Sequence, residues 1–132
     1  MKPADKIRQA IKEVVGKNID FVVEHPADES HGDYATNVAM MMKGNPRELA
    51  QDLAEELKKS DILGEVVDLS RIEVAGPGFI NFWLRKEYLE SELARVLEKK
   101  ENYGRNEWLI GKKVVVEFTD PNPFKEFHIG HL

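Results

Sequence analysis

The sequence predicts an α+β fold in which helices pack on one face of a small antiparallel sheet. Three observations lead to this prediction. Three segments repeat apolar residues at the spacing of one helical face, and short β-branched or alternating segments lie between them. The third observation is Gly76-Pro77-Gly78, which separates two of the short segments and is typical of the turn in a hairpin.

The first helix is predicted over residues 3–15, because Pro3 suits its first turn and Gly16 suits its end. The residues of its buried stripe are Ile7, Ala10, Ile11, Val14 and Val15. A short strand is expected over residues 19–23, where β-branched and aromatic residues gather, and a polar loop over residues 25–33 follows it.

The chain turns apolar again over residues 34–43, which are expected to form a short helix. Asn45 and Pro46 then supply the N-cap and the first position of a second long helix, which runs to about Lys59. Leu49, Ala50, Leu53, Ala54 and Leu57 form its core stripe.

A half-exposed strand is expected around Ile72 and Val74, and a second strand over residues 79–84 after the turn. Alternation in the second strand places Phe79, Asn81 and Trp83 on one face and Ile80, Phe82 and Leu84 on the other. The second face is uniformly apolar, so we expect it to be buried and Phe79 to be accessible.

The last predicted helix covers residues 85–100, with Tyr88, Leu89, Leu93, Val96 and Leu97 expected to point inward. Residues 105–113 read as a linker. Val114, Val115 and Val116 form an unbroken apolar run, typical of a strand covered on both faces in a parallel sheet. Such a sheet needs crossover helices and further strands, so we expect residues 114–132 to be the truncated start of a second domain.

Composition excludes several classes of protein. The 132 residues are 42% hydrophobic and 33% charged, which suits one folded domain better than a disordered chain. Cysteine is absent, which excludes disulfides, thiolate catalysis and sulfur-ligated zinc. No apolar run approaches the roughly 20 residues of a membrane span, and we expect a cytoplasmic protein. The net charge of −5, with the acidic excess in residues 24–73, argues against binding nucleic acid by bulk electrostatics.

The final segment, VVVEFTDPNPFKEFHIGHL, contains the residues most suggestive of chemistry. An apolar strand leads into a loop with Lys125 and ends at His128, Gly130 and His131. Ligands of open α/β sheets bind where strand ends meet helix N-termini, and paired histidines there can donate hydrogen bonds to phosphate oxygens. Gly130 would let a nucleotide lie against the backbone. The segment therefore predicts a site for ATP phosphates, although HxGH also arises by chance in sequences of this length.

HIGH is the signature of class I aminoacyl-tRNA synthetases, and PNPFKEFHIGHL resembles the corresponding pattern of arginyl-tRNA synthetase. The earlier segments SHGDYATNVAM, PRELAQDLAEEL and EVAGPGFINFWL resemble the N-terminal additional domain of that family, in the same order. The resemblance implies an additional domain over residues 1–104, the linker over 105–113, and the start of a Rossmann-type catalytic domain over 114–132.

The resemblance also implies an arginine–tRNA ligase, which activates arginine with ATP and Mg²⁺ and transfers it to tRNA(Arg). His128 and His131 would stabilise the phosphate charge that grows during activation. Lys125 and Gly130 would join them in binding ATP, and the alternative for Lys125 is a solvated loop lysine.

Arginine itself would be bound by two residues of the same segment. Asn122 matches the family residue that holds the backbone groups of arginine, and Glu117 matches an acid on its guanidinium side. The alternative for Glu117 is a strand residue that faces solvent. Asp120 departs from the serine common in the family, so it receives no role.

In the first domain, the resemblance implies a platform for the D-loop at the elbow of the tRNA. Phe79 would stack on an unstacked base, while Asn81 would read its edge. The complete enzyme is expected to be a monomer with no membrane contact. The 132 residues alone are expected to bind no nucleotide cofactor and to be inactive.

Two other functions remain open. The chain could be a stand-alone RNA-binding or protein-interaction module in which HIGH is accidental, or a small nucleotidyltransferase, since those also hold nucleotides with HxGH. No metal site is predicted, because nothing fixes the geometry of His25 and His31 beside their acidic neighbours.

Overall fold

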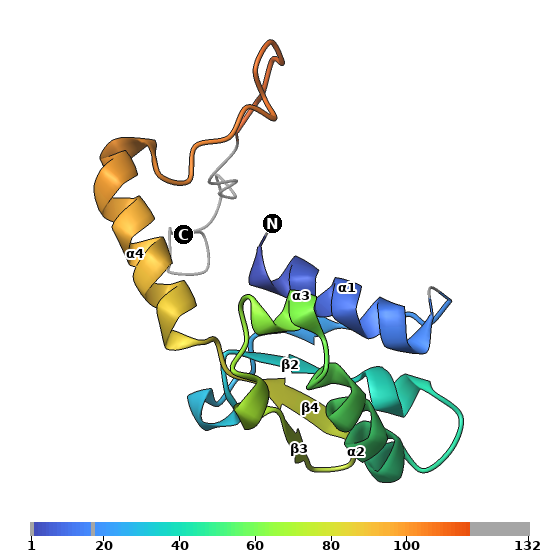
Figure 1. The fold of residues 1–132 in the computed structure, drawn as a ribbon. Helices are drawn as coiled ribbons and strands as arrows, with labels where there is room; N and C mark the ends of the chain where they lie inside the picture. Colours follow the sequence, from blue (N-terminus) through green and yellow to red (C-terminus); the bar gives the residue numbers. More distant parts are fainter. Residues whose placement is uncertain (1, 17, 117–132) are drawn as a thin grey trace, which may run out of the picture. The chain divides into compact units, whose positions relative to one another are not determined.

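The computed structural model describes residues 2–16 and 18–116, and it confirms the α+β fold (Figure 1). The chain divides into two units, one ending at Glu98 and the other beginning at Lys99. The first unit contains all the strands found in the described residues, together with the helices that cover them. Any site built on the sheet therefore lies in the first unit.

The sheet of the first unit has four antiparallel strands in the order β1-β2-β4-β3. The strands are β1 (Val23–Glu24), β2 (Tyr34–Thr36), β3 (Glu73–Ala75) and β4 (Phe79–Phe82). β3 and β4 are the hairpin predicted around the glycine–proline–glycine turn. β4 is central, because it pairs with β3 on one side and with β2 on the other.

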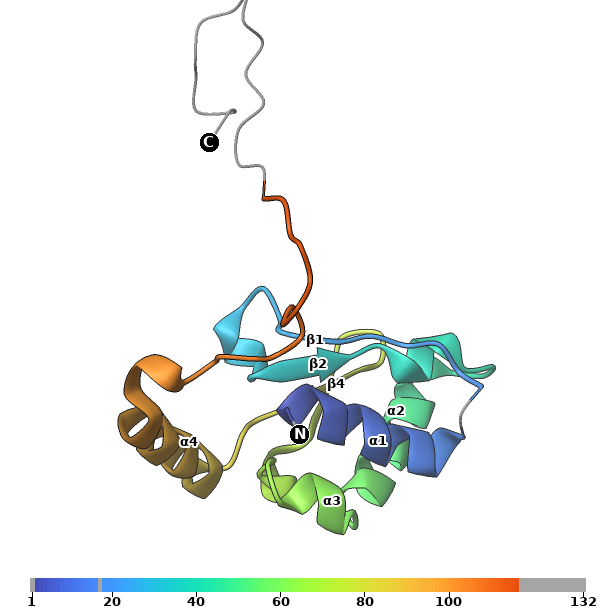
Figure 2. The same cartoon turned by 90° about the horizontal axis from the view of Figure 1, so that it is seen from above.

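Three helices lie against one face of this sheet (Figure 1), namely α1 (Pro3–Val15), α2 (Pro46–Leu57) and α3 (Asp61–Gly64). Seen from above, α1 and α3 run side by side (Figure 2). The predicted cap of α2 is confirmed, because the Asn45 side chain accepts a hydrogen bond from the Arg47 backbone N–H at 3.2 Å.

The core lies between the helices and the sheet. From β4 it takes Ile80 and Phe82, both fully buried, as the alternation of that strand predicts. From α1 it takes Ile7, Ala10 and Ile11, which belong to the predicted stripe. Val15 packs against the core in part, but Val14 is exposed near the end of the helix, so the prediction that it is buried is wrong. The opposite face of the sheet, which carries Phe79, is free of these helices.

The prediction of a short helix over residues 34–43 is wrong for the first half of that segment. Tyr34–Thr36 form β2 instead, and a 3₁₀ turn, η2 (Val38–Met41), follows. Tertiary pairing makes this segment a strand, because β1 and β4 pair with β2 along its two edges. The Thr36 hydroxyl adds a hydrogen bond to the Val22 carbonyl at 2.7 Å. β1 is shorter than expected and covers only the end of the apolar segment.

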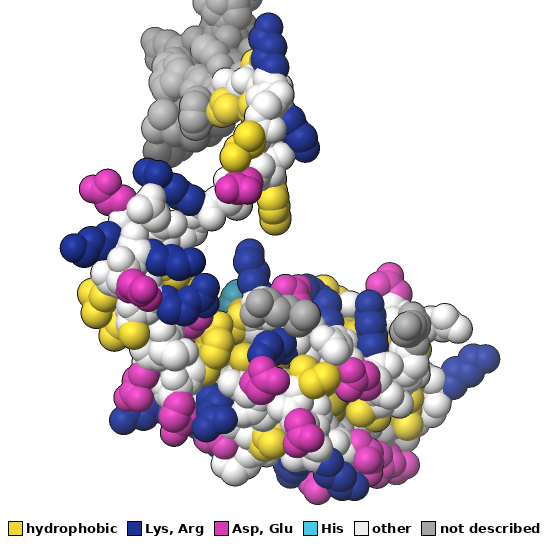
Figure 3. Space-filling model, turned by 45° about the horizontal axis from the view of Figure 1, so that its top comes forward, with side chains coloured by type: hydrophobic (Ala, Val, Ile, Leu, Met, Phe, Trp, Pro, Cys, Tyr) yellow, Lys and Arg dark blue, Asp and Glu magenta, His cyan; other side chains and the backbone are white. Residues whose placement is uncertain are grey.

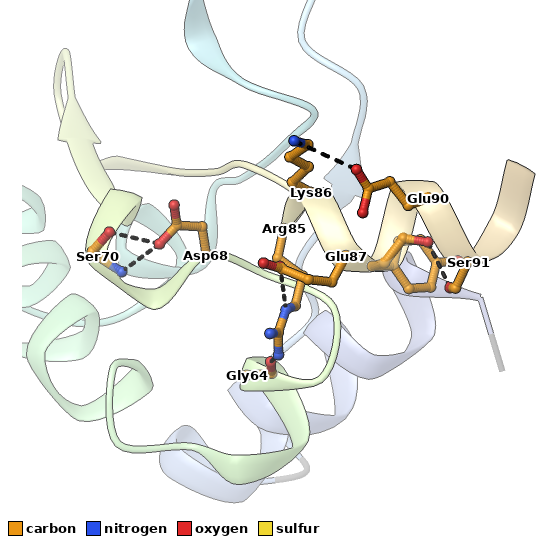
Figure 4. A network of polar contacts seen from close by, with 9 residues as sticks. Gly64, Asp68, Ser70, Arg85, Lys86, Glu87, Glu90 and Ser91 are labelled. Carbon is orange, nitrogen blue, oxygen red and sulfur yellow. Dashed lines mark hydrogen bonds and ion pairs between the residues drawn. The ribbon is translucent and has the colours of Figure 1, made fainter.

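The last helix of the first unit, α4 (Lys86–Lys99), is tied to the core at its start (Figure 4). Arg85 donates to the Gly64 carbonyl at 2.9 Å and to the Glu87 carboxylate at 3.1 Å. Tyr88 packs against the core, as expected. The other four residues expected to point inward are exposed, because the helix leaves the core after its first turn; they are Leu89, Leu93, Val96 and Leu97.

The described part of the second unit consists of a short 3₁₀ segment, η4 (Lys100–Asn102), and turns. The strand expected over residues 114–116 does not form there, and all three valines are exposed. A strand of a parallel sheet is defined by its neighbours, and no described residue pairs with this segment.

Candidate functional site

A groove of about 450 Å³ lies on the face of the sheet that the helices leave uncovered. All four strands or the loops next to them contribute to it. Its lining comprises Glu24, Pro26, Ala27, His31, Ala35, Ala75, Gly76, Pro77, Phe79 and Asn81. The groove therefore joins two stretches of sequence that are far apart along the chain, residues 24–35 and 75–81.

The floor of the groove follows one row of the sheet. Register places Glu24 of β1 opposite Ala35 of β2, Ala35 opposite Asn81 of β4, and Asn81 opposite Glu73 of β3. Side chains of directly paired residues lie on the same face. The small side chain of Ala35 stands in the middle of this row, so the floor is hollow beside Asn81.

Asn81 is the polar group of this floor. It is only 3% exposed, yet it lines the groove, and no side-chain hydrogen bond of its amide is found among the described residues. An amide carries two donor hydrogens and one acceptor oxygen, and a buried amide is normally satisfied by a partner. The groove thus presents a donor and an acceptor to whatever enters it.

Phe79 forms one wall and is 36% exposed, as its predicted face requires. It pairs with Ala75, whose small side chain leaves one side of the ring open. The turn before it is held tightly, because a Cβ on Gly78 would come within 2.8 Å of the Pro46 carbonyl oxygen at a φ of +136°. Only glycine fits there, and the turn consequently fixes where the ring stands.

The opposite wall is the loop between β1 and β2, stiffened by its own hydrogen bonds. The Asp28 carboxylate accepts from the Ser30 backbone N–H at 2.9 Å and caps η1 (Glu29–His31). Hydrogen bonds from the Ser30 side chain and then from its backbone lower the pKa of Asp28. His25 packs its ring against Tyr34, with centroids 4.3 Å apart, and its Nδ1 lies 2.7 Å from the Asp33 carbonyl oxygen.

Asp33 and Gly32 hold the base of this loop and have a structural role. The Asp33 carboxylate accepts from the Leu84 backbone N–H, and the Asp33 N–H donates to the Phe82 carbonyl. Gly32 lies against that same carbonyl group. Neither residue lines the groove, but together they fix the loop against β4.

The arrangement is suited to a flat ligand with polar edges. An aromatic wall can stack on a planar ring, while one amide can pair with the edge of that ring. The rim carries the exposed side chains of Glu24 and His31, and the exposed Glu73 lies next to Asn81 in the same row of the sheet. Negative charge at the rim disfavours a ligand whose ring is itself negatively charged.

A larger depression, of about 700 Å³, runs along α1 but does not form a comparable site. Its lining comes from one helix and its end, and the acids and bases there sit next to one another, as in the ion pair of Asp5 with Arg8. On the face of the first unit seen in Figure 3, Lys and Arg side chains are likewise interspersed with Asp and Glu.

The two site residues predicted in the first domain, Phe79 and Asn81, are brought together in the groove. The sequence did not predict that Asn81 is buried, because the loop wall that covers it has no periodic pattern. The contributions of Ala35 and Ala75 were missed as well. Strand pairing, which a single sequence does not specify, is what brings these small residues beside the two predicted ones.

The remaining predicted site residues lie outside the described residues; they are Glu117, Asn122, Lys125, His128, Gly130 and His131. Asp120 lies outside them too. Within residues 2–16 and 18–116 there is no cluster of three or more histidine and acidic side chains arranged for a metal ion. None of the helices in that part of the chain is long and apolar enough to cross a bilayer.

Comparison with known families matches residues 2–84 to the arginyl tRNA synthetase N terminal domain. The chain is also similar to proteins named arginine–tRNA ligase. It is 42% identical over 133 residues to that of Thermotoga maritima, covering 95% of this chain and 23% of the relative. It is 40% identical over 116 residues to that of Oceanobacillus iheyensis, covering 85% and 20%.

A third relative, from Staphylococcus carnosus, is 37% identical over 145 residues and covers 99% of this chain and 25% of the relative. The chain thus spans between a fifth and a quarter of the length of these relatives. Because the third alignment extends over nearly the whole chain, it takes in the segment after residue 114 as well as the groove.

Proposed function

The chain belongs to the family of the arginyl-tRNA synthetase N-terminal domain, and on this premise we propose that its first unit docks on tRNA. The groove on the open face of the sheet receives one unstacked base, in the D-loop at the tRNA elbow. Residues 1–104 are the docking domain, residues 105–113 the linker, and residues 114–132 the start of the catalytic domain.

The observation that carries this proposal is Asn81, a residue only 3% exposed, whose amide lines the groove and has no side-chain hydrogen bond among the described residues. No buried side-chain nitrogen or oxygen of the described residues lacks a partner, so the Asn81 amide reaches solvent in the groove, where the polar edge of a ligand can replace water. A nucleobase offers both donors and acceptors on its edge, and its face can stack on Phe79. Stacking on an aromatic contributes about 1–3 kcal/mol per base.

Bulk electrostatics do not support this docking, since the chain carries a net charge of −5. The affinity must therefore come from shape and from the base contacts rather than from a basic surface. This favours the D-loop, where bases are splayed out of the helix, over a regular RNA duplex, whose bases are stacked and paired.

We further propose that the whole protein is an arginine–tRNA ligase, as the names of its relatives suggest. Its substrates would be arginine, ATP with Mg²⁺, and tRNA(Arg), and it would act in the cytoplasm as a monomer. Lys125, His128, Gly130 and His131 would bind ATP. In the complete enzyme, His128→Ala or His131→Ala is expected to slow arginine activation by roughly 100-fold, since each removes a donor to the phosphate charge.

Glu117 and Asn122 would bind arginine in that enzyme, through its guanidinium group and its backbone groups respectively. The matching test is the KM for arginine, which Glu117→Gln should raise because it removes the charge that pairs with the guanidinium. An unchanged KM would contradict this role for Glu117.

The test of the groove is a titration of this chain with an unmodified tRNA(Arg) transcript. Phe79→Ala is expected to weaken binding by roughly tenfold, and Phe79→Tyr to retain it, because only the first loses the stacking surface. Asn81→Ala is expected to weaken binding about fivefold, the value of one net hydrogen bond. Tyr103→Ala is the matched control, since it removes an exposed aromatic from the other unit.

The RNA side supplies the complementary control. Transcripts in which single D-loop positions are made abasic should identify one position whose loss weakens the wild-type chain but not the Phe79→Ala variant. If neither Phe79→Ala nor Asn81→Ala changes the affinity while thermal unfolding shows both variants folded, the groove is not the tRNA site.

A further inference from the structure

The face of the sheet that carries the groove continues past Asn81 to Trp83, whose ring supports a guanidinium group. The Cζ atom of Arg71 lies 4.7 Å from the centroid of the Trp83 ring. A cation at this distance from an aromatic face is attracted by the ring electrons. The pair is partly exposed and lies beside the groove without lining it.

Backbone contacts fix this pair in place. Arg71 is the last residue of η3 (Leu69–Arg71), and Asp68 caps that turn by accepting from the Ser70 backbone N–H at 3.0 Å. The Asp68 N–H donates in turn to the Trp83 carbonyl at 2.9 Å. The turn that carries the arginine is therefore hydrogen-bonded to the strand that carries the tryptophan.

The guanidinium of Arg71 is stacked on Trp83 and has the Asp68 carboxylate as an electrostatic neighbour. Among the described residues it forms no ion pair and no side-chain hydrogen bond, and its side chain is exposed. Guanidinium presents its donors as a planar fork that matches phosphate oxygens, and stacking leaves the edges of that fork free. The group is therefore presented to solvent in one orientation, ready to bind an anion.

Arg71 differs in charge from the residues around the groove. Glu24 in its lining and Glu73 beside Asn81 in the sheet carry carboxylates, which repel phosphate. Among the described residues that line the groove or lie between Leu69 and Trp83, Arg71 carries the only permanent positive charge. A ribose–phosphate backbone attached to a base in the groove is thus repelled on two sides and attracted on this one.

We infer that Arg71, held against Trp83, binds a backbone phosphate of the RNA segment whose base enters the groove. This inference rests on the proposed tRNA docking. Trp83 lies two residues beyond Asn81 on an extended segment, about 7 Å along it, which suits a phosphate close to the inserted base. The pair would set the direction in which the RNA strand leaves the groove.

The experiment measures the affinity of this chain for the tRNA(Arg) transcript at several salt concentrations. The background carries Trp108→Phe, so that Trp83 is the only tryptophan left and its fluorescence reports binding. Arg71→Ala is expected to weaken binding by roughly tenfold at low salt and to reduce the slope of log K against log salt by about one, since one phosphate contact is lost. Phe79→Ala should weaken binding without changing that slope.

Two matched variants separate charge from structure. Arg71→Lys keeps the charge but not the planar fork, so the slope should be retained while the affinity falls only in part. Lys12→Ala removes one exposed positive charge from α1, on the helix side of the sheet, and should change neither quantity.

The outcomes distinguish this inference from the proposed function. If Phe79→Ala and Asn81→Ala weaken binding but Arg71→Ala leaves the salt slope unchanged, the phosphate contact is wrong and the base site stands. If Arg71→Ala acts no more strongly than Lys12→Ala, the contact is likewise wrong. If the wild-type chain fails to bind the transcript at any salt concentration, both the base site and the phosphate contact are overturned.

Discussion

The Asp33 carboxylate accepts a hydrogen bond from the backbone N–H of Leu84 at 2.7 Å, across 51 residues of sequence. A second bond, from the Asp33 N–H to the Phe82 carbonyl at 2.9 Å, lies beside it. Together they extend the pairing of β2 with β4 beyond the last backbone pair of the two strands. The side chain thus replaces a rung of the sheet at the base of the groove.

Removing this side chain should destabilise the first unit. Asp33→Ala leaves the Leu84 N–H without its partner, and we expect a loss of about 1–3 kcal/mol in the free energy of unfolding. Asp33→Asn should cost less, because its amide oxygen can still accept. Urea unfolding measures both, and Asp52→Ala, an exposed acid on α2, is the control. Equal effects of Asp33→Ala and Asp52→Ala would contradict this role.

Alanine substitutions at two glycines separate the cost of backbone strain from the cost of crowding by an added side chain. Gly16 and Gly32 both have positive φ, +88° and +94°, but a Cβ on Gly16 meets nothing within 4 Å. A Cβ on Gly32 would lie 2.7 Å from the Phe82 carbonyl oxygen. Gly16→Ala should therefore cost about 1–2 kcal/mol of unfolding free energy from conformation alone. Gly32→Ala should cost clearly more, and similar losses would show that β4 moves aside easily.

Leucines on α2 and α4 should differ sharply in their effect on stability. Leu57 on α2 is 1% exposed, so Leu57→Ala is expected to cost about 2–5 kcal/mol. Leu93 on α4 is 60% exposed, and Leu93→Ala should change the stability by less than about 0.5 kcal/mol. Thermal unfolding monitored by circular dichroism tests this contrast. A large loss from Leu93→Ala would mean that α4 packs against another surface in solution.

The cap at Asp68 should give stability a defined pH dependence. Its hydrogen bonds from Ser70 lower the pKa of its carboxyl in the folded state. A group with a lowered folded pKa stabilises the fold above its unfolded pKa, about 3.9 for aspartate, and this contribution is lost as pH falls through the folded pKa. The stability difference between wild type and Asp68→Ala should therefore be constant near neutral pH and shrink below about pH 4. A difference that persists unchanged at pH 2 would contradict the assignment.

Periodic features of the sequence predicted the fold well. The cap of α2, the inward face of β4 and the stripe of α1 apart from the exposed Val14 follow from local patterns, and the structure confirms them. The prediction for Tyr34–Thr36 was wrong because a three-residue segment adopts the structure of its neighbours, here the strands on its two edges. The predicted inward face of α4 was wrong because periodicity reports an apolar face but not what covers it.

The candidate site was predictable only where it depends on the alternation of a single strand. Alternation placed Phe79 and Asn81 on one face, and that much is confirmed. The depth of the groove depends on Ala35, which lies 46 residues from Asn81 in sequence and opposite it in the sheet. No local pattern connects the two. The predictions for residues 117–131 stay predictions, since they lie outside the described residues.

The pairing of Ala35 with Asn81 also links ligand binding to folding. The floor and walls of the groove come together only when the strands pair, so the unfolded chain holds no trace of the site. By mass action, any molecule that occupies the groove must raise the melting temperature, and a concentration one hundred times its dissociation constant adds about 2.7 kcal/mol of stability. Thermal denaturation in the presence of short oligonucleotides can therefore screen for the preferred base without any label.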